Sequence, residues 1–125
     1  MIVIPLPWLK PPLTGNRTRG NPYARASEVK AAKGDAICAI RTNRPRPVVG
    51  AEVTLHFLPA NKRRRDADGL APTLKVCLDA LVAEAILPDD SWVHVPAATC
   101  RIHPPDGEPA RMWLELSVLT EWSDA

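Results

Sequence analysis

Cysteine is scarce in this 125-residue chain, and the sequence has no long uninterrupted run of apolar residues. The three cysteines, at positions 38, 77 and 100, are an odd number and lie far apart, so a disulfide framework is not expected. The apolar run Met1–Leu9 is too short and too rich in proline for a membrane span, and it lacks the features of a signal peptide. These absences argue against a secreted, disulfide-stapled domain and predict a cytoplasmic protein without a membrane partner.

Motifs of several enzyme and metal classes are also absent. The sequence contains no Walker phosphate loop, no Gly-x-Gly-x-x-Gly turn and no Ser-His-Asp arrangement, so no nucleotide cofactor is expected. Cys100 and His103 have a spacing that zinc sites permit, but no second close pair exists. His94 would face the opposite side of a strand predicted over residues 92–103. A zinc site is therefore disfavoured.

Charge is divided unevenly along the chain, although the net charge is only +2. Residues 1–65 carry 13 Lys and Arg against 3 Asp and Glu, and residues 66–125 carry 3 against 11, which gives net charges of +10 and −8. The sign changes between Arg65 and Asp66. A strongly basic half suggests a polyanionic partner such as DNA, although a solvated charged face is the commoner explanation of such blocks.

Hydrophobic periodicity predicts four strands and two helices in a single domain spanning residues 1–125. The strands are expected over residues 2–8, 51–59, 92–103 and 111–122, and the helices over about 24–41 and 72–86. The order β-α-β-α-β-β is typical of an α+β fold in which two helices pack on a mixed β-sheet of about four strands. The last two strands are expected to pair through a tight turn at residues 104–107. Core or interface packing is expected for the four tryptophans, Trp8, Trp92, Trp113 and Trp122.

Aspartates on either side of the second predicted helix form a candidate metal site. Asp66 and Asp68 are one residue apart, so in an extended segment both carboxylates would point to the same side. Such close like charges repel unless a cation lies between them, and hard oxygen ligands suit Mg²⁺ or Mn²⁺. Asp90 supplies a further carboxylate after the helix. Taken singly, each aspartate is more simply explained as a helix cap or a turn residue.

Basic residues flank the acidic pair on both sides. The run Lys62–Arg65 comes directly before Asp66, and Lys75 lies on the predicted helix that follows. A phosphodiester needs cations to bind its backbone and metal-held carboxylates to activate water, and this segment offers both. The alternative is a charged edge that discourages aggregation.

The stretch RRRDADGLAPTLKVCLDALVAEAILPDDSW at residues 63–92 resembles the signature of RusA-type Holliday junction resolvases of phages and bacteria. In that family an Arg-Asp-x-Asp-Asn run is followed by a lysine, a helix containing Asp-Ala-Leu, and an Asp-Asp pair. The residues that take these places here are Arg65, Asp66, Asp68, Lys75, Asp79, Ala80, Leu81, Asp89 and Asp90. The opening LPWLKPP at residues 6–12, with Asn16 and Arg17 after it, is also similar to the family. Gly69 departs from the usual asparagine, and the segment between Asp68 and Lys75 is three residues longer than in the family pattern.

The resemblance implies a homodimeric, Mg²⁺-dependent endodeoxyribonuclease, with Mn²⁺ as an expected substitute, in a bacterial or phage-infected cell. It implies resolution of four-way DNA junctions by symmetric paired nicking, in recombination, repair or phage DNA processing. By motif position, Asp66, Asp68 and Asp90 would be metal-binding catalytic carboxylates and Lys75 the catalytic lysine. The candidate DNA-binding residues are Lys62, Arg63, Arg64, Arg65, Asn16, Arg17 and Arg19. The alternatives are a non-catalytic, junction-binding architectural protein and a nuclease for another branched substrate.

The length of the second predicted helix raises the question of which chain completes the site. A helix of about 15 residues spans roughly 22 Å, so Asp68 and Asp90 of one chain would lie near its opposite ends. The favoured expectation is a site shared between two antiparallel copies of this helix about a two-fold axis. The alternative is a loop at Leu87–Pro88 that folds back within the chain.

Overall fold

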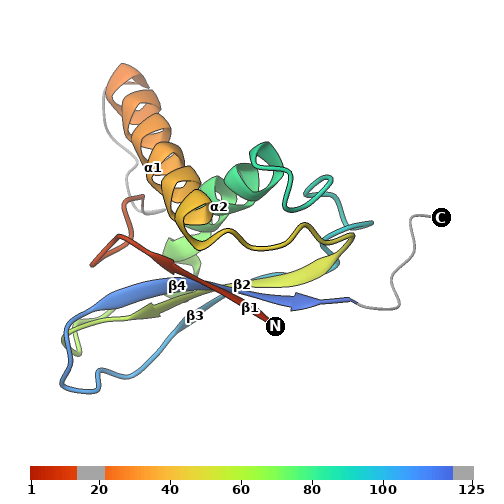
Figure 1. The fold of residues 1–125 in the computed structure, drawn as a ribbon. Coiled ribbons are helices and arrows are strands. Elements are labelled where there is room, and N and C mark those ends of the chain that lie inside the picture. Colours follow the sequence, from red (N-terminus) through yellow and green to blue (C-terminus); the bar gives the residue numbers. More distant parts are fainter. Residues whose placement is uncertain (14–21, 120–125) are drawn as a thin grey trace.

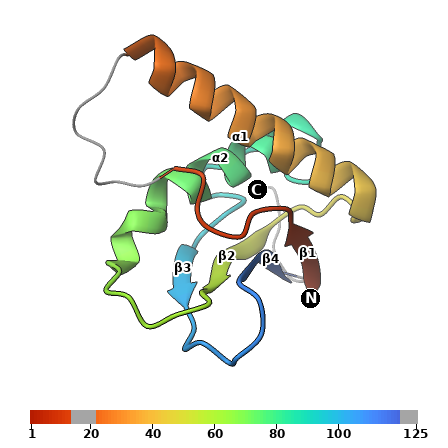
Figure 2. The same cartoon turned by 90° about the vertical axis from the view of Figure 1, so that its left-hand side faces the viewer.

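The computed structural model describes residues 1–13 and 22–119 of the chain. Within these residues the elements are β1 (Ile2–Leu6), α1 (Pro22–Asn43), β2 (Ala51–Leu58), the 3-10 helix η1 (Ala67–Leu70), α2 (Ala71–Ala83), β3 (Ala98–Ile102) and β4 (Arg111–Val118). They form a single α+β domain in which both α-helices lie on the same face of a mixed four-stranded sheet (Figures 1 and 2). The predicted fold class and the order β-α-β-α-β-β are confirmed.

The sheet has the strand order β1-β4-β2-β3. β4 pairs antiparallel with both β1 and β2, whereas β3 runs parallel to β2. The expected pairing of the last two strands through a tight turn is therefore wrong, because β2 lies between them. Its residue Leu55 is paired with Cys100 of β3 on one side and with Leu114 of β4 on the other. The loop 103–110 instead connects β3 to β4 past the end of β2 (Figure 2).

The apolar core lies between the sheet and the two helices. Strand β2 buries Val53, Leu55 and Phe57 as its alternating pattern predicts. Helix α2 buries Leu74, Val76, Cys77, Leu78, Ala80 and Leu81. Burial also raises the pKa of the Cys77 thiol to about 12, so this cysteine is a packing residue and not a nucleophile. Pro72 lies in the first turn of α2, where its missing N–H costs no hydrogen bond.

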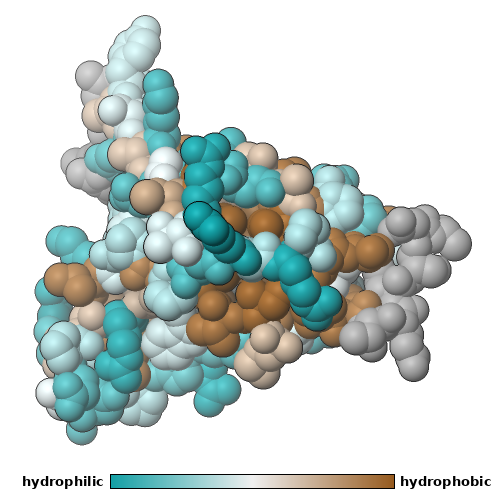
Figure 3. Space-filling view, in the orientation of Figure 1, coloured by the Kyte–Doolittle hydropathy of each residue, from teal (hydrophilic) through white to brown (hydrophobic). Residues whose placement is uncertain are grey.

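Helix α1 packs on the rest of the molecule through its C-terminal half. Its buried residues are Ala32, Ala36, Ala39 and Ile40, whereas Val29 is 37% exposed. The N-terminal part rises away from the sheet in Figure 1, and the same region is mostly pale or hydrophilic in Figure 3, while hydrophobic residues gather over the middle of that view. In the described part of the chain, neither helix combines the length and the apolar composition that a bilayer crossing requires.

The tryptophans have different surroundings. Trp8 is buried, and its Nε1 donates a hydrogen bond to Asp35 Oδ2 of α1 at 3.1 Å. Trp113 is half-buried on the helix-free face of the sheet. Trp92 is 74% exposed, so it does not pack within the core, and its packing at an interface stays a prediction. It lies in a turn, because β3 begins at Ala98 and not at Trp92. Trp122 lies outside the described residues.

Candidate functional site

The basic run Lys62–Arg65 and the pair Asp66 and Asp68 follow the end of the sheet where the parallel strands β2 and β3 both finish. The linker 59–66 leaves β2 here and leads into η1, and the loop 103–110 lies at the same end (Figure 2). The carboxyl ends of parallel strands share one edge of a sheet, and ligands commonly bind beside that edge. The topology thus brings the basic run and the acidic pair to a position suited to binding.

Arg65 organises the basic linker. Its guanidinium donates hydrogen bonds to the main-chain carbonyls of Asn61 and Arg63, each at 2.9 Å, and to Asn61 Oδ1 at 2.8 Å. The same guanidinium lies 5.6 Å from the centre of the Phe57 ring. These contacts leave Arg65 only partly exposed. The exposed cations of the linker are Lys62, Arg63 and Arg64.

Asp66 and Asp68 lie where the linker turns into helix. Asp66 is extended, with φ −93° and ψ 135°, whereas Asp68 is inside η1. The expectation that one extended segment points both carboxylates to the same side is wrong, because the chain begins to coil at Ala67. Asp66 makes no side-chain capping bond to η1, and the N-cap residue of α2 is Leu70. Both carboxylates are exposed, and Asp66 Oδ1 lies 3.7 Å from Arg64 Nη2.

Lys75 connects the acidic residues that follow. Its Nζ donates to Asp90 Oδ2 at 2.8 Å and lies 3.1 Å from Asp79 Oδ1, one helical turn along α2. The hydrogen bond with Asp90, and after it the one with Asp79, raises the pKa of Lys75. The bond with Lys75 is also the main reason that the pKa of Asp90 is lowered. The lysine is therefore held as a cation and Asp90 as a carboxylate.

The segment after α2 folds back along the helix within the same chain. Ala85 adopts a left-handed conformation with φ 58°, and the amides of Ile86 and Leu87 bond to the Leu81 carbonyl at 2.9 and 3.4 Å. Ile86 and Leu87 are buried, so the turn is fixed by packing. Asp90 consequently reaches Lys75, the fifth residue of α2. The premise that Asp90 lies at the far end of the helix from Asp68 is therefore wrong, and the segment folds back within the chain as the alternative expected. A site shared between two chains stays a prediction.

The three aspartates fit a magnesium site in their chemistry but are not gathered into a ready-made centre. Carboxylate oxygens are the ligands that Mg²⁺ prefers, and Mg²⁺ is often held by one or two carboxylates together with waters and substrate phosphates. Within residues 1–13 and 22–119, no three His, Cys, Asp or Glu side chains are placed to hold a metal ion together. Asp66 and Asp68 are the exposed pair, whereas Asp90 is engaged by Lys75.

A second polar cluster, which sequence analysis missed, lies on the helix-free face of the sheet. His56 Nδ1 is 2.8 Å from His103 Nε2, and His56 Nε2 is 2.9 Å from Glu115 Oε1. The Trp113 ring stacks on both imidazoles, with centroids 4.9 and 5.2 Å apart. Burial, and then the nearby cationic groups, lower the pKa of His103. The alternation of β2 could have placed His56 on this face, but its partners depend on the register with β4.

The histidines considered for zinc are used elsewhere. His94 lies before β3, and its Nδ1 bonds to the Val49 carbonyl at 2.8 Å. The argument that a strand separates the faces of His94 and His103 is therefore wrong, although each histidine has a different partner. Asn16, Arg17 and Arg19, predicted to contact DNA, lie outside the described residues.

Comparison of the sequence with protein-family models and with curated proteins finds no match.

Proposed function

We propose that this chain is a Mg²⁺-dependent, structure-selective endodeoxyribonuclease similar to the RusA-type resolvases, acting on four-way DNA junctions as a homodimer. The observation that carries the proposal is the exposure of the two carboxylates before α2, beside the basic linker. Asp66 and Asp68 are exposed, do not cap the helix and follow directly on the linker cations. Asp66 occupies the N-cap position of η1 and Asp68 lies in its first turn, but the Asp66 carboxylate makes no capping hydrogen bond there, and the N-cap residue of α2 is Leu70.

In this proposal, different residues have different roles in phosphodiester cleavage. Lys62, Arg63 and Arg64 contact phosphates of the DNA backbone. Asp66 and Asp68 would hold Mg²⁺, which when bound would activate water and stabilise the leaving oxygen. Lys75 holds the Asp90 carboxylate against α2, and Asp90 is the third carboxylate that the resemblance implies for the metal ion. Asp90 acts within its own chain in this proposal, which is supported by its contact with Lys75 of the same chain.

The decisive experiment offers the purified protein a synthetic four-way junction and a linear duplex, with and without Mg²⁺, and maps nicks on all strands. We expect symmetric paired nicks in the junction only when Mg²⁺ is present. Asp68→Asn should lower the nicking rate on the order of 100-fold or more, since it removes an oxygen donor, while junction binding persists. Glu52→Gln is the matched control, because it removes an exposed carboxylate from the start of β2.

Two results would overturn parts of this proposal. Junction binding without Mg²⁺-dependent nicking favours the architectural protein instead, and Asp68→Asn that nicks as fast as the unmodified chain rules out the assigned site. One arm of the experiment mixes Asp66→Asn with Asp90→Asn chains. Sites contained within one subunit leave every chain of this mixture defective, so recovery of nicking would show that the site is shared.

A further inference from the structure

A cavity of about 390 Å³ opens beside Asp66, between the N-terminal segment, the basic linker and η1. Among the described residues, four basic side chains line it, namely Lys10 and the arginines at positions 63, 64 and 65, against the one carboxylate of Asp66. The apolar side chains of Leu70 and Ile102 also line the cavity. The combination of excess positive charge with apolar surface suits a ligand that is anionic at one end and hydrophobic at the other.

Lys10 reaches this cavity from a segment that is tied down on both sides. On one side Trp8 donates its hydrogen bond to Asp35 of α1. On the other side the buried Thr73 hydroxyl donates to the Leu13 carbonyl at 2.7 Å and accepts from the Leu13 amide at 3.3 Å. The prolines at positions 11 and 12 further restrict the backbone between these anchors. The position of Lys10 is therefore built into the fold.

Arg65 gives the cavity a flat cationic surface. Its guanidinium rests against the Phe57 ring, and three hydrogen bonds to Asn61 and Arg63 fix its orientation. A guanidinium plane held in this way can stack on a nucleobase, as arginine does in many nucleic-acid complexes. Arg63 and Arg64, without this constraint, are the linker arginines that can turn toward a phosphate.

We propose that the cavity binds one unstacked nucleotide of the DNA strand, with its phosphate on Lys10, Arg63 and Arg64 and its base against Arg65 and Leu70. The ligand identity rests on the proposed function, which makes DNA the partner. A cavity of this volume lies in the range that accommodates small organic molecules, and it exceeds the needs of a phosphate group alone. Unstacking a nucleotide costs least where pairing is already interrupted, as at a branch point. The cavity thus provides a means of selecting branched DNA.

Two pairs of matched variants test this assignment. Gly69 lines the cavity, and a Cβ added there meets nothing within 4 Å, so Gly69→Leu is expected to fold and to fill the space. Gly34→Leu is its control, since Gly34 on α1 has equally open surroundings. Lys10→Ala removes the proposed phosphate contact, and Lys30→Ala removes one exposed charge from α1.

The first measurement titrates each protein with deoxyadenosine monophosphate, inorganic phosphate or deoxyadenosine by NMR, without divalent ions. We expect the nucleotide to bind at least about 5-fold more tightly than either part alone, because both ends of the cavity are then filled. Lys10→Ala should weaken nucleotide binding roughly 10-fold, the loss expected for one charge-assisted contact. Gly69→Leu should weaken it by at least as much because the leucine side chain fills the space for the nucleotide, and the two controls should not weaken it. Equal binding of inorganic phosphate, or unchanged nucleotide binding by Gly69→Leu, would overturn the proposal.

The second measurement places 2-aminopurine at the branch point of a four-way junction, again without divalent ions. Binding of the unmodified protein should raise its fluorescence several-fold as the base unstacks, and Gly69→Leu should abolish the rise while Gly34→Leu retains it. An equal rise with Gly69→Leu would place the unstacked base elsewhere. Both readouts are separate from cleavage, so absent Mg²⁺-dependent nicking sinks the nuclease alone and unchanged nucleotide binding sinks the cavity assignment alone.

Discussion

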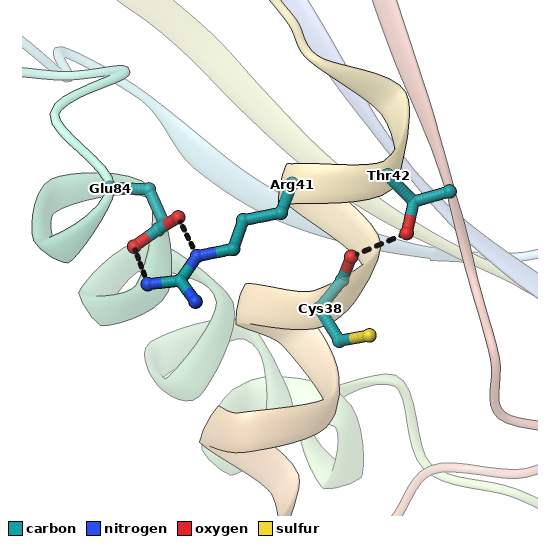
Figure 4. Close-up of polar contacts among 4 residues, drawn as sticks. All are labelled: Cys38, Arg41, Thr42 and Glu84. Atoms are coloured by element: carbon teal, nitrogen blue, oxygen red, sulfur yellow. Dashed lines mark hydrogen bonds and ion pairs between the residues drawn. The ribbon is translucent and has the colours of Figure 1, made fainter.

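The two ends of helix α2 use their polar groups in different ways. At the C-terminal end, both carboxylate oxygens of Glu84 accept hydrogen bonds from the Arg41 guanidinium of α1, at 2.6 and 3.2 Å (Figure 4). The Glu84 amide bonds to the Ala80 carbonyl at 3.0 Å, and the chain then buries Leu87. At the N-terminal end, Asp66 and Asp68 are exposed, and neither serves as the N-cap of α2.

This difference separates groups that hold the fold from groups that are available for binding. Glu84 links the two helices, and its ion pair raises the pKa of Arg41. The carboxylates of Asp66 and Asp68 stay at the surface, beside the cations of the linker, where water and phosphate can reach them. Stability should therefore depend on the C-terminal end of α2 and activity on the N-terminal end.

The largest expected effect on stability is at Leu87. Leu87→Ala should lower the free energy of unfolding by about 2–5 kcal/mol. Leu87 is 1% exposed, and removal of its side chain leaves a cavity under the segment that folds back after α2. Urea unfolding followed by circular dichroism measures this loss. Asp68→Asn is the change to compare at the other end, and it should stay within about 0.5 kcal/mol of the unmodified chain. A much larger loss with Asp68→Asn would give this carboxylate a structural role and remove the contrast.

A smaller effect, of opposite sign, is expected at Ala85. This residue has φ 58°, a left-handed conformation that glycine adopts without strain and that commonly follows a helix. Ala85→Gly should therefore stabilise the protein by about 0.5–1 kcal/mol, read as a higher urea midpoint. The control is Ala83→Gly, two residues earlier in the last turn of α2, which should destabilise by a similar amount. Destabilisation by both changes would contradict the left-handed turn.

The sequence predicted correctly the elements that are defined by their own pattern of apolar residues. It failed where an element depends on partners far away in the sequence. The alternation of Val53, Leu55 and Phe57 identifies β2 in any tertiary context. Which strand lies beside it depends on the whole sheet, and the proximity of β3 and β4 in sequence suggested the wrong pair. The start of β3 was misjudged because Trp92 and Val93 read as strand residues, whereas Trp92 is exposed in a turn.

Prediction of the candidate site from sequence was limited in the same way, by contacts with distant residues. The residue types and the basic run were visible in the sequence, but the positions of Asp68 and Asp90 were not. The 3-10 turn at Ala67–Leu70 breaks the extended geometry that the Asp-x-Asp spacing suggested. Asp90 reaches Lys75 because Ile86 and Leu87 are buried, a long-range packing effect. Lys10 was missed as a site residue because its distance from Arg63 in space is set by Trp8 and Thr73.

The smallest effect concerns the ion pair of Asp90 with Lys75, which is partly exposed. The pKa of Asp90 is lowered in the folded protein, so the unfolded chain binds more protons in acid, and the stabilising contribution is present above pH 3.8. It is lost as the pH falls through the lowered pKa. Asp90→Asn should therefore lose less stability than the unmodified protein between pH 7 and pH 3, by up to about 1 kcal/mol, as for other surface pairs.

The measurement is the urea midpoint at both pH values, with Glu52→Gln as the control for removal of a carboxylate outside this pair. Because the pair is accessible to solvent, 1 M salt should reduce the difference between Asp90→Asn and the unmodified chain. Identical acid sensitivity of the two proteins would mean that Lys75 does not hold Asp90 in solution. The carboxylate of Asp90 would then be as available to a metal ion as those of Asp66 and Asp68, and the division between the two ends of α2 would place Asp90 with the N-terminal group.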